Sequence, residues 1–241
     1  MYQNYSQLND DLIQKILDEN KRTSSMLIHE LRNPLSLIKG TLQYIEMTHH
    51  EVKEYKYWSQ LFDLIMDMEL LMSDASLLNS SSSLNIKATN IIDLIHSVMD
   101  NYTPQANSQQ KLLTFKYASE HESVFSSFPC DADKIKQVLS NLLKNALEAT
   151  LSGDSIEVIL DINKADAESM LSIEINDNGQ PIPDDELDTI FNPFVTHKVG
   201  GTGVGLALAK RITEAHLGSI QVLSTNELTG FTILLPLPKA I

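Results

Sequence analysis

Apolar side chains in the first eighty residues recur every three or four positions, which is the period of an α-helix. One stripe begins at Ser24 and continues through Leu27, Leu31, Leu35, Ile38, Leu42 and Ile45. A second stripe consists of Trp58, Phe62, Ile65, Met68, Met72 and Ala75. The polar segment THHEVKE (48–54) separates them, so the pattern predicts a helical hairpin. Two helices bury too little apolar surface to be stable alone, and we therefore expect a second copy to complete a four-helix bundle.

The pattern changes after the serine-rich joint NSSSSLN (79–85). Strands are predicted at LNIKA, KLLTFKYA, SIEVILDI, MLSIEIND, GSIQVLS and FTILLPL, and helices at TNIIDLIHSVMDNY, DADKIKQVLSNLLKNALEAT and GVGLALAKRITEAH. Strands paired by hairpins, with helices on one face, predict an α/β sandwich of the α+β class. We expect two domains, residues 1–83 and 84–241.

Charge and composition limit the function. The chain of 241 residues has 18 Lys and Arg against 32 Asp and Glu, a formal charge of −14, which disfavours nucleic acid and anionic lipid as partners. Such a chain can still bind ATP if Mg²⁺ and backbone N–H groups supply positive charge. Cys130 is the single cysteine, and the sequence has neither a long apolar run nor a signal-peptide pattern. We expect a cytoplasmic location, with any membrane or sensor segment upstream of these residues.

The segment SMLIHELRNPL (25–35) combines a histidine with a proline inside a predicted helix. Pro34 costs about 3 kcal/mol in a helix interior and predicts a bend one turn after His29. Asn33 lies one turn beyond His29 on the same face, whereas Glu30 points about 100° away. Neutral imidazole is a nucleophile near neutral pH. A solvated surface histidine is the alternative for His29.

Two polar clusters in the second domain suggest ligand chemistry. Asn141 and Asn145 are four residues apart on one helix face, and their amide oxygens suit Mg²⁺, although polar residues on an exposed helix face are also ordinary. Asp177 ends an alternating strand and precedes Asn178 and Gly179. Its carboxylate can accept a hydrogen bond from the exocyclic amine of adenine, or it can belong to a plain turn.

A third cluster is rich in glycine. Gly200, Gly201, Gly203 and Gly205 directly precede an apolar-periodic helix, so backbone N–H groups and a helix N-terminus converge there. This arrangement predicts an anion site, and a flexible surface loop is the alternative. Leu206 stands where a dinucleotide fingerprint needs its third glycine, and no GxxxxGK[ST] motif occurs.

Five motifs, in this order, resemble the boxes of bacterial sensor histidine kinases. HELRNPL resembles the phosphoacceptor box, NLLKNALEA the asparagine box, DNG the first glycine box, FNPFVTHK the phenylalanine box and GGTGVGLALAKRI the nucleotide lid. The resemblance implies a dimerisation and phosphotransfer hairpin and a Bergerat-type ATP-binding sandwich. It also implies a homodimer that phosphorylates a histidine from ATP and passes the group to the receiver domain of a response regulator. A phosphatase activity on the phosphorylated regulator is a further activity that the resemblance suggests.

The same resemblance implies residue roles. His29 would accept the γ-phosphate, Glu30 would orient or deprotonate it, and Asn33 would reach the phosphoryl group or a water. The implied nucleotide-binding residues are Asn141 near the phosphates, Asn145 on Mg²⁺, Asp177 on adenine, and Gly179, Lys198, Gly201, Thr202, Gly203, Gly205 and Leu206. The family usually has a second glycine two positions after Gly179, where this chain has Pro181 with its φ fixed near −65°.

Two other functions remain open at this point. One is a phosphorelay or docking protein with the same bundle and a degenerate ATP domain. The other is an ATPase or chaperone of the same nucleotide fold, in which water accepts the phosphoryl group. The asparagine box and lid argue against the first, and the HELRN helix argues against the second.

Overall fold

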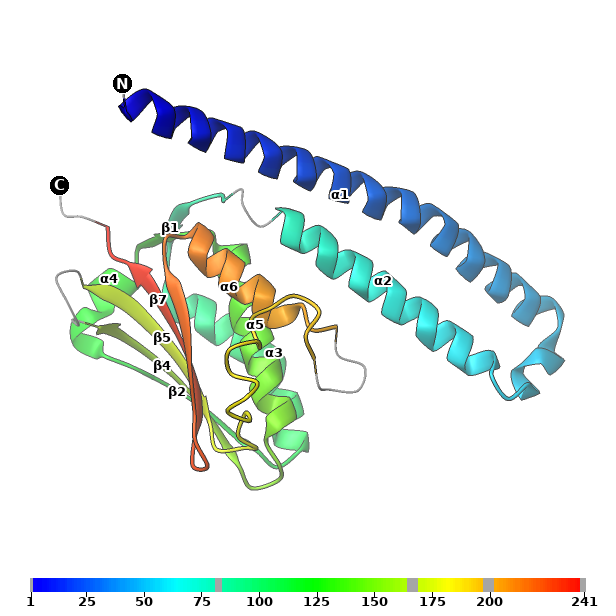
Figure 1. The fold of residues 1–241 in the computed structure, drawn as a ribbon. Coiled ribbons are helices and arrows are strands. Elements are labelled where there is room, and N and C mark those ends of the chain that lie inside the picture. Colours follow the sequence, from blue (N-terminus) through cyan, green and yellow to red (C-terminus); the bar gives the residue numbers. More distant parts are fainter. Residues whose placement is uncertain (1, 81–83, 164–168, 197–201, 239–241) are drawn as a thin grey trace. The chain divides into compact units, whose positions relative to one another are not determined.

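The computed structural model describes residues 2–80, 84–163, 169–196 and 202–238 (Figure 1). They divide into two compact units, residues 1–80 and 81–241. The first unit is helical and the second contains all seven strands of the described residues, which confirms the predicted α+β class. In the part of the chain that the structure describes, no helix is long and apolar enough to cross a bilayer.

The first unit is a helical hairpin, as predicted. It consists of α1 (Tyr2–Thr48), the 3₁₀ turn η1 (His50–Glu54) and α2 (Trp58–Ser80). Leu35 of α1 and Ile65 of α2 are buried, and Lys39 Nζ lies 2.7 Å from Glu69 Oε2 between the helices. Pro34 lies inside α1 without ending it. The helix therefore continues through Pro34, and the bend expected there stays a prediction.

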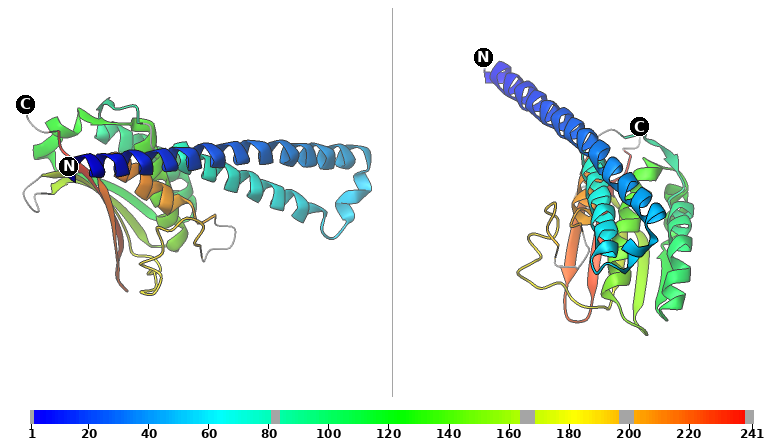
Figure 2. Two further views of the ribbon diagram at one scale, coloured as in Figure 1. Left: turned by 45° about the horizontal axis from the view of Figure 1, so that its top comes forward. Right: turned by 90° about the vertical axis from the view of Figure 1, so that its right-hand side faces the viewer.

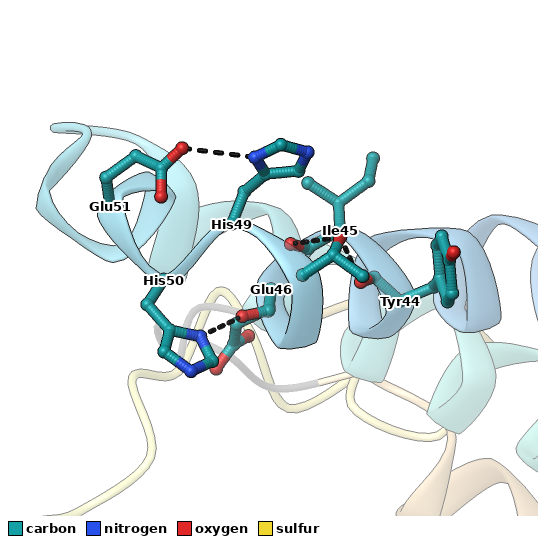
Figure 3. Close-up of polar contacts among 7 residues, drawn as sticks. Tyr44, Ile45, Glu46, His49, His50 and Glu51 are labelled. Atoms are coloured by element: carbon teal, nitrogen blue, oxygen red, sulfur yellow. Dashed lines mark hydrogen bonds and ion pairs between the residues drawn. The ribbon is translucent and has the colours of Figure 1, made fainter.

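The tip of the hairpin is built by side chains that satisfy the last carbonyls of α1 (Figure 3). The Thr48 hydroxyl donates to the Tyr44 carbonyl at 2.9 Å, and His50 Nδ1 donates to the Glu46 carbonyl at 3.0 Å. Glu46 also accepts from Trp58 Nε1 at 3.4 Å. Because helix ends leave carbonyls without intrahelical partners, these bonds allow α1 to stop and the chain to turn.

The second unit is a sheet covered by helices. Its elements are β1 (Lys87–Thr89), α3 (Ile91–Ser108), β2 (Leu112–Tyr117), η2 (Ser119–His121), α4 (Glu122–Phe125), β3 (Phe128–Cys130), α5 (Ala132–Ala149), β4 (Ser155–Asn163), β5 (Met170–Asp177), α6 (Gly205–Ala215), β6 (Ser219–Ser224) and β7 (Thr229–Pro236). The main sheet has the order β2-β4-β5-β7-β6, and β1 pairs with β3 separately. Helices α3, α5 and α6 lie on one face of the main sheet (Figure 2).

One pairing differs from the prediction. β4–β5 and β6–β7 are antiparallel hairpins, but β2 pairs with β4 in parallel, with Leu113 opposite Ile156. A parallel pair needs a long crossover rather than a hairpin, and here α4, β3 and α5 form it. The short strand β3 was not predicted, because it has three residues and contains Pro129.

The core lies between α5 and the main sheet. Ile135, Leu139 and Leu142 follow the helical period on the buried side of α5, and Ile173 and Ile175 of β5 face the same core. Burying each such side chain stabilises the fold by about 1.5–3 kcal/mol. This packing fixes which face of α5 carries its asparagines.

Candidate functional site

The predicted phosphoacceptor residues lie on the surface of α1. His29, Glu30 and Asn33 are all exposed within the hairpin, and the buried Leu35 follows them on the inner side. Because α1 is continuous here, His29 and Asn33 are separated by one helical turn, as the sequence predicted. An exposed imidazole with an amide one turn away is accessible to a second reactant.

Asn141 connects two of the predicted boxes. Its Nδ2 donates to the carbonyl of Gly205, the first residue of α6, at 3.2 Å. A Cβ at Gly205 would lie 3.5 Å from the Asn141 amide carbon, so the two residues are already in contact. Asn145 is half-buried one turn further along α5. The asparagine helix and the start of the glycine-led helix therefore meet.

The base of the predicted lid is closed by backbone contacts. Phe194 N donates to the Gly203 carbonyl at 3.0 Å, and both residues have positive φ, 65° and 67°. A Cβ at Gly203 would lie 2.6 Å from the Val195 carbonyl oxygen, which only glycine avoids. Thr202 is half-buried at this base, whereas Lys198 and Gly201 lie outside the described residues.

The N-terminus of α6 is suited to an anion. Val204 precedes the helix and has no polar side-chain atom that could cap it. The first backbone N–H groups of a helix point outward without intrahelical partners, and the helix dipole is positive there. Gly205 adds no side chain at this end, and Leu206 is half-buried behind it. A phosphate group fits this chemistry.

Asp177 ends β5 in a buried position, with an exposed fraction of 3%. Its Oδ1 accepts from Gly179 N at 3.0 Å, which tightens the turn that follows the strand. Thr229 of β7 lies directly opposite Asp177 and is equally buried. Sequence reasoning missed Thr229, because its place beside Asp177 comes from the β5–β7 pairing of distant segments.

Gly179 packs against the end of α5. Gln180 N donates to the Ala149 carbonyl at 3.0 Å, and a Cβ at Gly179 would lie only 2.5 Å from the same oxygen. The turn after Asp177 is therefore fitted to the last residue of the helix that carries Asn141. This close approach joins the predicted base-binding strand to the predicted metal-binding helix.

The start of α5 is held by a buried carboxylate. Asp131 accepts from Lys134 N at 3.2 Å and from Asn85 N at 2.8 Å, and its own N–H donates to His216 Nε2 at 3.0 Å. Burial raises the pKa of the Asp131 carboxyl, but the N–H donors of Asn85 and Lys134 and the nearby His216 lower it by more, so the net pKa is below its ordinary value. The ionised form is thus the one that caps α5.

The chemistry of the donors is compatible with a magnesium nucleotide. Mg²⁺ commonly takes one or two protein oxygens and completes its shell with phosphates and waters. Asn145 could supply such an oxygen from α5. Among the described residues, no three His, Cys, Asp or Glu side chains gather as a metal cage. The site would therefore depend on the nucleotide for most of the metal ligands.

Comparisons with known proteins agree with this arrangement. Residues 130–240 match the family described as histidine kinase-, DNA gyrase B-, and HSP90-like ATPase. The chain is 34% identical over 212 residues to sporulation kinase A of Bacillus subtilis (strain 168), covering 87% of this chain and 33% of the relative. It is 31% identical over 238 residues to sensor histidine kinase ZraS of Escherichia coli (strain K12), covering 95% of this chain and 49% of the relative.

A solved structure supports the same grouping. The catalytic domain of histidine kinase ThkA is 27% identical, with a TM-score of 0.56, and the match covers 63% of this chain and 95% of that chain. This chain spans between a third and a half of the length of the two curated relatives. Residues 130–240 therefore belong to the family of histidine kinase-, DNA gyrase B-, and HSP90-like ATPases, and the chain is similar over most of its length to sensor histidine kinases and sporulation kinases.

Proposed function

We propose that the chain transfers the γ-phosphoryl group of ATP to His29 and then to an aspartate of a response regulator receiver domain. The observation that carries this proposal is the bond from Asn141 to Gly205, because it joins the asparagine helix to the start of α6. The HELRNPL segment on the exposed face of α1 supplies the acceptor. Relatives named sensor histidine kinase and sporulation kinase support the same activity.

In residues 84–241, each group has a defined part in nucleotide binding. The Asp177 carboxylate accepts from the exocyclic amine of adenine, which is a donor that a carboxylate can pair with. The N-terminus of α6, with Lys198 and the lid glycines, receives the phosphates. Asn145 is a ligand for Mg²⁺, which neutralises the developing phosphate charge when bound. Asn141 holds α5 against the first residue of α6 through its hydrogen bond to the Gly205 carbonyl.

On α1, the imidazole of His29 is the nucleophile. Its ring nitrogen forms a bond to the γ-phosphorus while the bond to the β,γ-bridging oxygen breaks, and ADP leaves with that electron pair. Glu30 orients the ring and takes up its proton. Asn33 positions a water for a separate reaction, the hydrolysis of the aspartyl phosphate on the response regulator. A side chain one turn from the acceptor is close enough for this role.

A homodimer completes the hairpin. Large apolar side chains of α1 and α2 are more than 40% exposed in the single chain: Met26, Leu27, Leu31, Leu37, Ile38, Leu61, Leu64, Met66 and Met68. An exposed apolar face made of such side chains commonly marks a protein interaction site. A second copy that buries this face as a four-helix bundle accounts for it. Light scattering after gel filtration should give twice the chain mass of 27.0 kDa.

The test compares ATP binding, phosphate release and protein labelling in one preparation with γ-labelled ATP and Mg²⁺. The kinase proposal expects stable label on the wild-type chain, and His29→Gln should abolish the label while a fluorescent ATP analogue binds as before. Absence of ATP binding would favour the phosphorelay alternative. Release of phosphate without labelled protein would favour an ATPase. The Asn145→Asp variant should bind Mg–ATP less productively, and normal turnover would remove Asn145 from the metal site.

A further inference from the structure

The loop that follows Asp177 contains two prolines on either side of one residue. Pro181 and Pro183 have no backbone N–H, so Ile182 carries the single amide donor of residues 181–183. That N–H donates to the Ser224 hydroxyl oxygen at 2.8 Å. Ser224 is the last residue of β6, far from the loop in sequence. The bond therefore ties the proline segment to the β6–β7 hairpin.

Ser224 also contacts the strand that faces Asp177. Its Oγ lies 2.8 Å from Thr229 Oγ1, and Thr229 is paired with Asp177 in the β5–β7 register. Thr229 and Asp177 are both buried, whereas Ser224 is half-buried. One hydroxyl thus connects the proline segment to the threonine beside the predicted base-binding carboxylate.

The opposite side of the loop is fixed independently. Ser155 N donates to Asn178 Oδ1 at 2.7 Å, and Gln180 N donates to the Ala149 carbonyl at 3.0 Å. The loop is therefore attached to the α5–β4 side at residues 178 and 180 and to the β6–β7 side at residue 182. The bond from Ile182 to Ser224 is the attachment on the second side.

The two prolines explain why one hydrogen bond can fix this segment. Each proline ring restricts φ to about −65°, and each also restricts the residue before it to extended conformations. Few conformations remain for the backbone from Gln180 to Pro183, so the entropy that a single bond must overcome is small. A glycine at position 181 would allow many more conformations. At the position where the family usually has a glycine, this chain thus has Pro181, and the loop there has a fixed backbone and not a flexible one.

We propose that Ser224 is a positioning residue for the nucleotide base, which it holds indirectly by fixing the 178–183 loop against β6 and keeping Asp177 aligned with the adenine amine. This inference rests on the proposed function, because it assumes that Asp177 receives adenine. Ser224 acts through the loop and through Thr229. Its effect should therefore appear in base binding and not in the phosphoryl transfer step.

Adenine and guanine provide a direct test of this role. Adenine presents an exocyclic amine where guanine presents a carbonyl oxygen, and only the amine can donate to a carboxylate. Loss of the Ser224 hydroxyl should misalign Asp177, weaken ATP binding and leave the poorer GTP binding nearly unchanged. The ratio of ATP to GTP affinity should fall by about fivefold, the fold-change equivalent to about 1 kcal/mol at 1.4 kcal/mol per tenfold.

The experiment uses the full chain and three variants: Ser224→Ala, Ser224→Thr and Thr225→Ala. Thr225 is a matched control, because its hydroxyl accepts from Glu227 N and Leu228 N within the same β6–β7 turn. Calorimetric titration with Mg–ATP and Mg–GTP gives the two affinities, and labelling at several ATP concentrations gives KM and kcat. Thermal unfolding by circular dichroism shows whether each variant is folded.

For Ser224→Ala we expect an ATP Kd and KM raised about fivefold, with kcat at saturating ATP within twofold of wild type. Ser224→Thr should restore the ATP affinity, and Thr225→Ala should match wild type. Unchanged ATP affinity in Ser224→Ala, equal losses of ATP and GTP affinity, or no restoration by threonine would each overturn the inference. A wild-type chain that does not bind Mg–ATP would overturn the proposed function itself, and the inference with it.

Discussion

Gly179→Ala tests how closely the base loop is fitted to α5. A Cβ at residue 179 would lie 2.5 Å from the Ala149 oxygen, 2.6 Å from its carbonyl carbon and 2.9 Å from Thr150 N. All three neighbours are backbone atoms, so no side-chain rotation can relieve the contact. Gly179 is not among the residues with positive φ, and alanine would therefore be tolerated there if the helix end were absent.

The size of the effect follows from these distances. Ordinary contact begins at 3.4 Å, so the loop and the end of α5 must separate by about 0.9 Å. Such overpacking costs about 1–3 kcal/mol. The displacement also stretches the bond from Gln180 N to the Ala149 carbonyl, which contributes about 1 kcal/mol. If ATP binding requires the loop in its original position, the overpacking cost alone should lower ATP affinity by about five- to a hundredfold at 1.4 kcal/mol per tenfold.

The assay is titration of Mg–ATP by calorimetry, together with urea unfolding of the same preparations. Gly153→Ala is the matched control, because Gly153 has a φ of 93° and open space around its Cβ position. Alanine there should cost about 1–2 kcal/mol of backbone strain and leave ATP affinity unchanged. The reasoning would be refuted by wild-type ATP affinity in Gly179→Ala, or by an equal loss of affinity in Gly153→Ala.

Three further predictions concern other parts of the chain. Gly40→Ala should stabilise α1 by about 0.5–1 kcal/mol, because glycine destabilises a helix interior relative to alanine and a Cβ at this position would meet no atom within 4 Å. The urea midpoint, followed by the fluorescence of Trp58, the only tryptophan, should therefore rise, and a lower midpoint would contradict this. The Asp131 carboxyl has a lowered pKa, so its stabilising contribution is complete above about pH 3.9 and is lost as the pH falls below that value. Asp131→Asn, which keeps a cap oxygen, should therefore unfold with a shallower dependence on pH below about 4, and identical slopes would contradict this. Glu30→Ala should impair labelling from ATP, while Asn33→Ala should mainly impair phosphate release from a phosphorylated receiver domain; equal loss of both activities in both variants would remove the division of roles.

Local patterns predicted most of the elements. The helical period identified α1, α2 and α5, and on α5 the predicted stripe, which includes Ile135 and Leu139, is buried. Alternating apolar residues identified β4 and β5, and Ile156, Val158 and Leu160 are the buried alternate positions of β4. Asp177 at the end of its strand and Gly205 at the start of its helix also followed from neighbouring residues alone. These features depend on interactions within a few positions of the chain.

Contacts between distant segments could not be predicted in the same way. The parallel pairing of β2 with β4 depends on a crossover, and no local signal specifies it. Thr229 is placed opposite Asp177 by sheet register, and Ser224 reaches Ile182 across 42 positions.

The most direct test of the account is to map the phosphoryl group after incubation of the full chain with γ-labelled ATP and Mg²⁺. Phosphohistidine is stable in alkali and lost in acid, and peptide mass spectrometry can locate it. The account predicts one alkali-stable, acid-labile phosphate on the peptide that contains His29, and none in His29→Gln. Phosphate on another residue, or complete hydrolysis of ATP without labelled protein, would contradict the assignment of this chain as a histidine kinase with His29 as its acceptor.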